Sequence, residues 1–192
     1  MRSTGGVDPR QARLLELFQR AQAQVTDRVD AVEAEQWDAV VRPGRDVADL
    51  VAHLVAEQLR VLWLLTGDPT GGLVPTDTEE LLAGDTLGSW ESTADAALTA
   101  WAEPGAMETT VQLADGPAAA ADHLAALTTH LTVHAWDLAR ATDGDLALDA
   151  ELVEAGLAQV LGARPGDAAD EQPAPAGADP LARLLAALGR RA

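Results

Sequence analysis

Apolar residues recur at steps of three and four positions along four long stretches of the sequence, and this spacing is typical of one face of an α-helix. The stretches cover residues 9–35, 46–67, 86–103 and 116–142. Each is bounded by glycine, proline or an acidic residue that can cap a helix. An amphipathic helix must bury its apolar face, and four long helices do so most simply by packing on one another. The sequence therefore predicts an all-α fold built as a four-helix bundle.

The segments between and after these stretches are predicted to be short. Met107–Leu113 is rich in β-branched residues, which indicates an extended connector or a single hairpin strand. Residues 162–179 hold three prolines among glycine, alanine and aspartate, and they are predicted to form a loop or strap. Three short helices are predicted at 79–83, 149–161 and 180–189. We therefore expect one domain over residues 1–192, with extra short helices at its C-terminal end.

The charge balance argues against two classes of partner. The chain has 13 basic and 31 acidic residues, a net charge of −18. Such a field repels nucleic acid and anionic membrane surfaces. No apolar run approaches the ~20 residues that span a bilayer, and the N-terminal MRSTGGVDPRQ lacks the apolar region of a signal peptide. These features lead us to expect a soluble, cytoplasmic protein.

Missing residue types limit the chemistry further. The chain contains no cysteine, lysine or tyrosine, which removes intrinsic thiol nucleophiles, Schiff bases and phenolic acids. None of the three serines lies in a G-x-S-x-G motif, and no G-x-G-x-x-G follows a strand-like run. If the protein is an enzyme, its reactivity must come from carboxylates, histidine, a bound metal, or a nucleophile that a small molecule supplies.

Three of the four histidines are placed so that they can meet. His130 and His134 are four residues apart on one predicted helix, so both imidazoles leave the same face. His53 lies midway along another helix among apolar neighbours, where an unpaired imidazole is costly to bury. If these helices face each other, three imidazoles converge and leave a fourth position open, as in a catalytic zinc site. The alternative is that the histidines share a face by chance and make ordinary hydrogen bonds.

Two longer motifs surround these histidines. Residues 42–54 read RPGRDVADLVAHL and residues 130–143 read HLTVHAWDLARATD. Together they resemble the DinB-like, metal-binding four-helix family that includes the N-terminal domain of mycothiol-dependent maleylpyruvate isomerase. The resemblance implies that His53, His130 and His134 hold a divalent metal, most often zinc, with nickel, iron or manganese as alternatives.

The chain also departs from that family. Relatives often carry Cys-x-Gly-Trp before the second helix, where this sequence has Arg42-Pro43-Gly44-Arg45. Many relatives have a carboxylate where His130 stands. Three neutral ligands would leave the site at +2 and make a bound water or thiol more acidic. Within residues 1–192 we expect no counterpart of the isomerase's second domain, so the specific ring chemistry of that enzyme is not implied.

Carboxylates near the histidines are candidates for a supporting role. Glu57 lies one turn after His53 and Asp49 one turn before it, so either can accept a hydrogen bond from a ligand or act as a general base. For Asp49 a solvated helix charge is the favoured interpretation, and for Glu57 both remain open. Asp137, three residues after His134, can orient that imidazole, but an ion pair with Arg140 is favoured.

Three further residues have two interpretations each. Arg60 can bind an anionic substrate group or form a surface ion pair. Trp136 can wall the pocket, where it would contact a cofactor, or pack in the core. His123 is seven residues before His130, and it is expected at the pocket rim or exposed rather than as a ligand.

An open metal position in a protein with no thiol of its own favours one activity. A low-molecular-weight thiol bound at the metal loses its proton and can attack an electrophilic small molecule. This predicts a thiol transferase or isomerase, and the family resemblance implies mycothiol as the thiol. Two alternatives stay open: a non-catalytic protein that binds metal and ligand for sequestration or resistance, and a hydrolase or cyclase that uses metal-bound water with Glu57 as base. Family members are often dimers, but the sequence shows no decisive interface patch.

Overall fold

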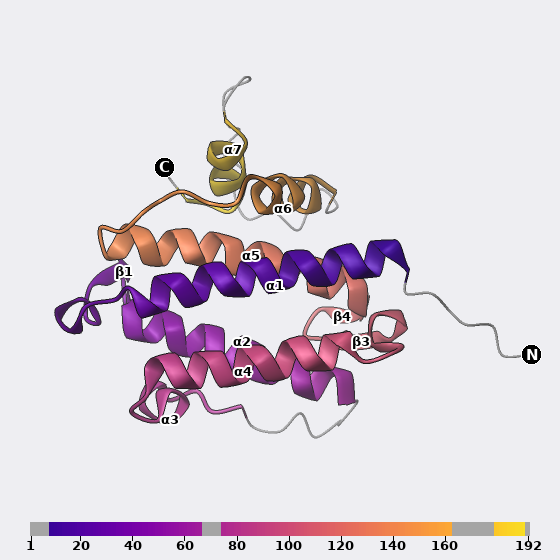
Figure 1. The fold of residues 1–192 in the computed structure, drawn as a ribbon, viewed down its shortest axis with the longest axis horizontal. Helices are drawn as coiled ribbons and strands as arrows, with labels where there is room; N and C mark the ends of the chain where they lie inside the picture. The colour runs from indigo at the N-terminus through magenta and orange to yellow at the C-terminus, as the bar shows by residue number, and fades with distance from the viewer. Residues whose placement is uncertain (1–7, 67–73, 163–178, 191–192) are drawn as a thin grey trace, which may run out of the picture.

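The computed structural model describes residues 8–66, 74–162 and 179–190. Four long helices form the bundle: α1 (Pro9–Asp30), α2 (Val47–Thr66), α4 (Thr86–Ala102) and α5 (Ala120–Ala141). Helix α1 packs against α4 and α5, and α2 packs closely on α4 but more loosely on α5 (Figure 1). The predicted all-α four-helix bundle is confirmed. None of the described helices is long and apolar enough to cross a membrane.

Helix α1 is shorter than its apolar pattern predicts. It ends at Asp30 rather than near Glu35: Val29 is its last buried residue, Asp30 and Ala31 are exposed, and Val32 packs on the core only partly buried. A 3-10 turn, η1 (Ala34–Gln36), follows. The Gln36 side chain donates a hydrogen bond to the Thr142 carbonyl at 3.1 Å, which ties this turn to the end of α5.

Asp46 starts helix α2 in the predicted way. Its Oδ1 accepts a hydrogen bond from the backbone N–H of Asp49 at 2.8 Å, which satisfies one of the free amides at the helix N-terminus. The register of His53 on α2 depends on this start, because every later residue follows the same helical repeat.

Replacing Asp46 with alanine is expected to lower the free energy of unfolding by about 1 kcal/mol, since the amide of Asp49 loses its partner. Asp46→Asn keeps an oxygen at the same place and should cost clearly less. Urea unfolding followed by circular dichroism measures both. Equal losses for the two variants would show that the cap contributes nothing.

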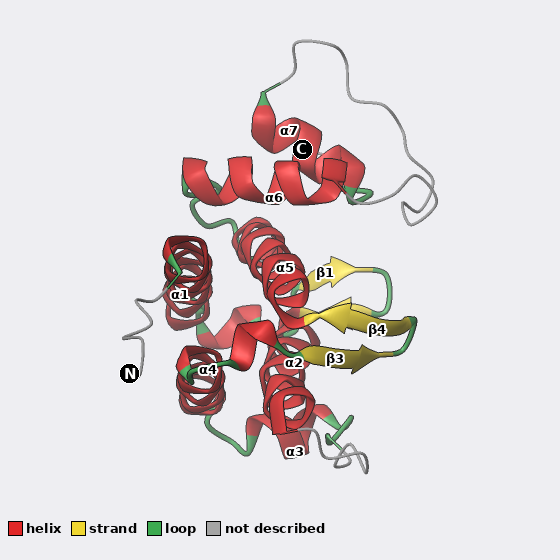
Figure 2. Cartoon of the chain, turned by 90° about the vertical axis from the view of Figure 1, so that its right-hand side faces the viewer, coloured by secondary structure: helices red, strands yellow, loops and turns green. Residues whose placement is uncertain are grey.

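Two β-hairpins interrupt the helical pattern. Strand β1 (Val40–Arg42) pairs with β2 (Arg45–Asp46), and β3 (Thr110–Leu113) pairs with β4 (Gly116–Ala119). Both lie on the side of the bundle that α2 and α5 form (Figure 2). The expected extended segment at Met107–Leu113 is thus largely strand β3, preceded by a 3-10 turn, η2 (Ala106–Glu108).

The prediction that Gly116-Pro117 opens the fourth long helix is wrong. Gly116 has φ of +119°, which a right-handed helix does not allow, and Pro117 lies opposite Gln112 in the hairpin. Proline is tolerated in such an edge strand because its missing N–H leaves no inner ladder bond unmade. The helix starts only at Ala120, where the hairpin returns to the bundle.

Three shorter helices complete the described fold: α3 (Thr78–Leu82), α6 (Ala150–Gly162) and α7 (Pro180–Ala187). Helices α6 and α7 form an outer layer on α5, on the face turned away from α2 (Figure 2). A second apolar cluster joins this layer to α5: Val133, Trp136, Val153, Leu157, Leu184 and Leu185. Nearly all of the predicted loop or strap at 162–179 lies outside the described residues.

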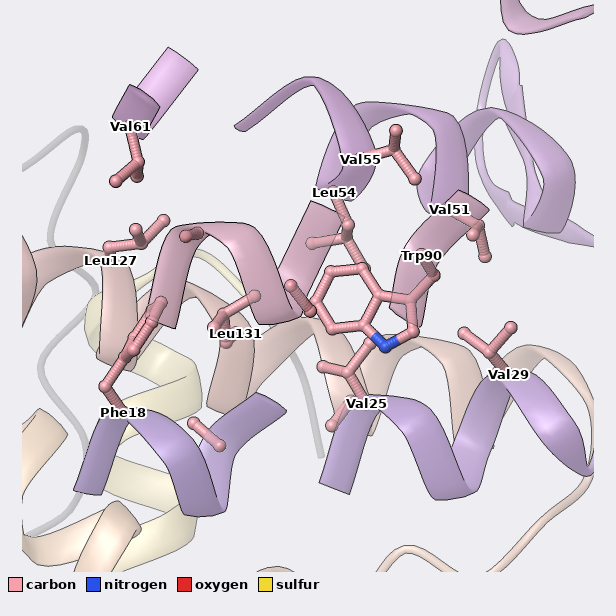
Figure 3. Close-up of a cluster of buried hydrophobic side chains, with 14 of the residues drawn as sticks. Phe18, Val25, Val29, Val51, Leu54, Val55, Val61, Trp90, Leu127 and Leu131 are labelled. Carbon is pink, nitrogen blue, oxygen red and sulfur yellow. The ribbon is translucent and has the colours of Figure 1, made fainter. Parts of the chain in front are cut away.

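The main core lies between the four long helices. Figure 3 shows Trp90 of α4 among Val25 and Val29 of α1 and Leu54 of α2. Trp90 is fully buried, and its indole N–H donates to Thr26 Oγ1 at 2.9 Å. This packing fixes how α2 is rotated in the bundle, and therefore which of its residues face α5.

Candidate functional site

Polar side chains of α2 and α5 meet in the seam between these two helices. His53 Nε2 lies 3.5 Å from Glu57 Oε1, and His130 Nδ1 lies 3.9 Å from the same oxygen. The rings of His53 and His134 are 5.7 Å apart between centroids and meet edge to face. The structure therefore places the three histidines from two distant parts of the chain around one carboxylate.

His134 is the most enclosed of the three imidazoles, with 8% of its surface exposed. Its Nδ1 lies 3.1 Å from Asp137 Oδ2, which also accepts hydrogen bonds from Arg190 Nη2 at 3.0 Å and Nε at 3.3 Å. When Nδ1 carries the proton that this carboxylate accepts, the lone pair of Nε2 is free for a metal or a proton. Asp137 is thus placed within hydrogen-bond distance to orient the His134 imidazole.

Neighbouring side chains stabilise the ionised form of the Asp137 carboxyl. Burial opposes ionisation, but the contacts with His134 and Arg190 lower the pKa of the Asp137 carboxyl. The sequence favoured an ion pair with Arg140, whereas the partners seen here are His134 and Arg190. The Arg140 guanidinium lies over the Trp136 ring, 5.3 Å from its centroid. Arg190 lies 53 residues after Asp137 in the sequence, and no sequence feature linked it to this site.

One carboxylate oxygen of Glu57 has no hydrogen-bond partner among the described residues. Its side chain is 15% exposed, and its Oε2 is buried without a hydrogen-bond partner among the described residues. Burial opposes ionisation, but the imidazoles of His130 and His53 lower the pKa of the Glu57 carboxyl. A buried, ionised carboxylate oxygen with no donor is costly, so a cation or a proton donor is expected there.

His53 and His130 differ in their surroundings. Burial lowers the pKa of His53, which keeps the imidazole neutral at neutral pH, the state that metal binding requires. The side chain of His130 is 53% exposed, so this residue forms the solvent side of the group. His123 is partly buried and lies 6.4 Å from Trp101 between ring centroids.

The donor set suits a divalent metal, but the side chains are not arranged around one point. Imidazole nitrogens and a carboxylate are typical ligands of zinc and related metals. Within residues 8–66, 74–162 and 179–190, no three or more His, Asp or Glu side chains form a group ready to hold a metal ion. The unpartnered Glu57 Oε2 fits such a cation, and side-chain rotation would be needed to complete the ligand set.

Two pockets of about 350 Å³ each flank the histidines. The α3-side pocket, on the side of α2 that faces α3, is lined by His53, Arg60 and Asp49 among others. Arg60 has no ion-pair partner among the described residues, so the surface ion pair considered from the sequence is not seen. Asp49 Oδ1 accepts a hydrogen bond from Thr78 at 2.9 Å, so this carboxylate is tied to α3 rather than free in solvent.

The second pocket lies between the β1–β2 turn, α5 and the end of α7, and we call it the arginine pocket. Its polar lining includes His134, Asp137, Arg42, Arg45, Arg140 and Arg190. In the sequence, Arg42 and Arg45 stand out only as a departure from a family pattern. Trp136 lines neither pocket and is 3% exposed, packed against α6 and α7. The structure therefore favours core packing for Trp136 over contact with a cofactor.

Comparisons with known proteins support the fold. No model of a known protein family matches the sequence, and no curated protein matches it. The structure is similar to the crystal structure of the mycothiol-dependent maleylpyruvate isomerase, with a TM-score of 0.61 and 18% identity. It is similar to a mutant of that isomerase with a histidine-to-alanine substitution, with a TM-score of 0.60 and 15% identity. Both matches cover 78% of this chain and 69% of the other, and they show a shared DinB-like helical fold.

Proposed function

We propose that this protein is a thiol-dependent isomerase or transferase that acts on an electrophilic small molecule with the help of a divalent metal. One observation carries the proposal: the Glu57 carboxylate lies where the imidazoles of α2 and α5 meet, and its Oε2 is buried without a hydrogen-bond partner among the described residues. The fold shared with an isomerase named for its dependence on mycothiol supports a thiol co-substrate.

The residues that would hold the metal are His53, His130 and His134. When bound there, a zinc ion lowers the pKa of a coordinated thiol, so that the thiol is a nucleophilic thiolate at neutral pH. The chain has no cysteine, so the thiol must come from solution, with mycothiol as the proposed source. Nickel, iron and manganese stay open as alternative metals.

The chain's own residues hold the site and handle protons. When Nδ1 of His134 carries the proton, Asp137 Oδ2 accepts a hydrogen bond from it and so leaves Nε2 available. Glu57 Oε2 is the group proposed to take the proton that the incoming thiol releases, because the carboxylate is ionised and this oxygen has no hydrogen-bond partner in the described part of the chain. Arg60 faces the α3-side pocket, where it can pair with an anionic group of thiol or substrate.

Turnover measurements test the proposed function. Zinc-loaded protein is incubated with mycothiol and an activated aromatic electrophile such as 1-chloro-2,4-dinitrobenzene, or with maleylpyruvate for isomerisation. We expect catalytic loss of thiol and electrophile in the first assay, or catalytic isomer formation in the second. Uptake that stops at one ligand per chain would instead show a sequestration protein. Turnover that continues without thiol would show a metal-water hydrolase or cyclase, and either result overturns the proposal.

The contact between His134 and Asp137 gives a prediction about metal affinity. Asp137→Ala should weaken zinc binding by about 10- to 100-fold, the usual cost of losing the carboxylate that orients a ligand histidine. Competition with a zinc-binding dye measures the dissociation constant. Asp122→Ala removes an exposed aspartate of the same helix and should bind zinc like the wild type. Equal affinity for both variants would mean that Asp137 does not position a metal ligand.

A further inference from the structure

The arginine pocket collects positive charge in a strongly acidic chain. Four of the 13 basic residues line this pocket of about 350 Å³, with Asp137 as the one carboxylate in the described lining. The arginines come from three places in the sequence: the β1–β2 hairpin, the end of α5 and the segment after α7. A cluster of four arginines is not expected by chance in a chain with a net charge of −18.

Two of these arginines form no ion pair within the part of the chain that the structure describes. No carboxylate of the described residues lies within ion-pair distance of Arg42 or Arg45. Burial and the charge of Arg42 lower the pKa of Arg45, and the more distant charges of Asp49 and Glu57 offset only part of this. Neighbouring guanidinium groups repel each other, and a bound anion would remove this repulsion.

The backbone holds the arginines in place. Arg42 and Arg45 flank the tight hairpin turn at Pro43-Gly44, where Gly44 has φ of +76°. Arg190 is fixed by its backbone N–H to the Leu185 carbonyl at 2.7 Å and by its side chain to Asp137. The backbone positions of Arg42 and Arg45 and the side chain of Arg190 are therefore fixed before a ligand arrives, which reduces the entropy lost on binding.

We infer that the arginine pocket binds the anionic group of a small molecule, a carboxylate or a phosphate, through Arg42, Arg45 and Arg190. Guanidinium groups match the oxygens of both anions by paired hydrogen bonds. His134 lines the same pocket, so a ligand held there would lie beside one of the proposed metal ligands. Resting on the proposed function, this inference assigns the electrophilic substrate to the class of small anionic molecules. The pocket volume fits such a molecule, and the charge of the whole chain disfavours a polyanion.

Titration calorimetry on metal-free protein tests this site without using activity. The probes are succinate, inorganic phosphate and the neutral succinamide. We expect at least one of the two anions to bind and succinamide not to bind. Binding of succinate alone would identify a carboxylate site, and binding of phosphate alone a phosphate site. No binding of either anion to the wild type, or equal binding of succinamide, would overturn the inference.

Arginine-to-glutamine variants test whether the anion binds in the arginine pocket. Arg45→Gln and Arg42→Gln should each weaken anion binding by about 10-fold or more, the usual worth of a charge-assisted hydrogen bond. Arg42 is exposed and forms no ion pair with any described residue, so its replacement should leave the fold intact. Arg183→Gln changes an exposed arginine of α7 outside the pocket and should bind like the wild type. Equal affinity in all three variants would place the anion elsewhere and overturn the inference.

Zinc titration of the same samples separates this inference from the proposed function. Zinc binding that depends on His134, together with no anion binding, would refute the arginine pocket as a ligand site and leave the proposed metal site standing. Anion binding without zinc binding would support the pocket and refute the metal-dependent function.

Discussion

Alanine in place of His134 is expected to abolish zinc binding. Metal-free wild-type protein should take up one zinc ion per chain. His134→Ala should bind zinc more than about 100-fold more weakly, a larger loss of affinity than is typical when only a residue that orients a ligand is removed. The reason is geometric: His134 is the enclosed imidazole whose Nδ1 faces Asp137, and its Nε2 is left for the metal. Elemental analysis after dialysis and titration with a zinc dye give the stoichiometry and the affinity.

A second histidine of the same helix serves as the control. His123 is partly buried near Trp101 and lies two turns before His130, so His123→Ala should keep the wild-type zinc stoichiometry. Circular dichroism establishes that both variants are folded. Retention of zinc by His134→Ala, or a wild type that takes up no zinc, would remove the metal site from the proposal.

Removal of the Trp90 side chain should have the largest effect on stability. Trp90 is fully buried between α1, α2 and α4, and its indole N–H bonds Thr26 Oγ1. Trp90→Ala is expected to lower the free energy of unfolding by about 3–5 kcal/mol, because the large cavity cannot collapse completely. A typical domain is stable by only about 5–15 kcal/mol, so this loss is a large share of the total. Urea unfolding measures it.

Two other tryptophan variants calibrate this result. Trp63 is only half-buried, so Trp63→Ala should cost clearly less than Trp90→Ala. Trp90→Phe keeps an aromatic ring and loses the bond to Thr26, so its cost should fall between the two. A cost for Trp90→Ala no larger than that for Trp63→Ala would mean that the cluster in Figure 3 does not dominate the stability of the bundle.

Local sequence signals predicted most of the helical architecture. The apolar spacing around Phe18 and Leu54 required helices with one buried face, and Asp46 marked the start of α2. The β4 strand was missed because Gly116-Pro117 also fits a helix start. Only pairing with β3, a contact between two separate segments, favours the strand. The apolar pattern also predicted an end of α1 that lies too far along the chain. Whether the last turn of this helix is buried depends on neighbouring elements, which the local pattern does not show.

In the candidate site, too, the sequence predicted some features and could not predict others. Helical spacing alone puts His130 and His134 on one face, and a buried position for His53 follows from its apolar neighbours. The sequence could not show that Glu57 would have a carboxylate oxygen without a partner at the meeting point, since this depends on how α2 and α5 are rotated against each other. Nor could it show that Trp136 would face α6 and α7.

By itself, the sequence determined which residues lie on the same helix face, because the 3.6-residue repeat is a local property of the backbone. It also excluded a protein thiol, since no cysteine is present. Only the tertiary structure decided that Arg45, Asp137 and Arg190 would share a pocket with His134. Their proximity comes from how the hairpin, α5 and α7 pack, and packing between distant segments is set by the whole core rather than by the spacing of any one motif.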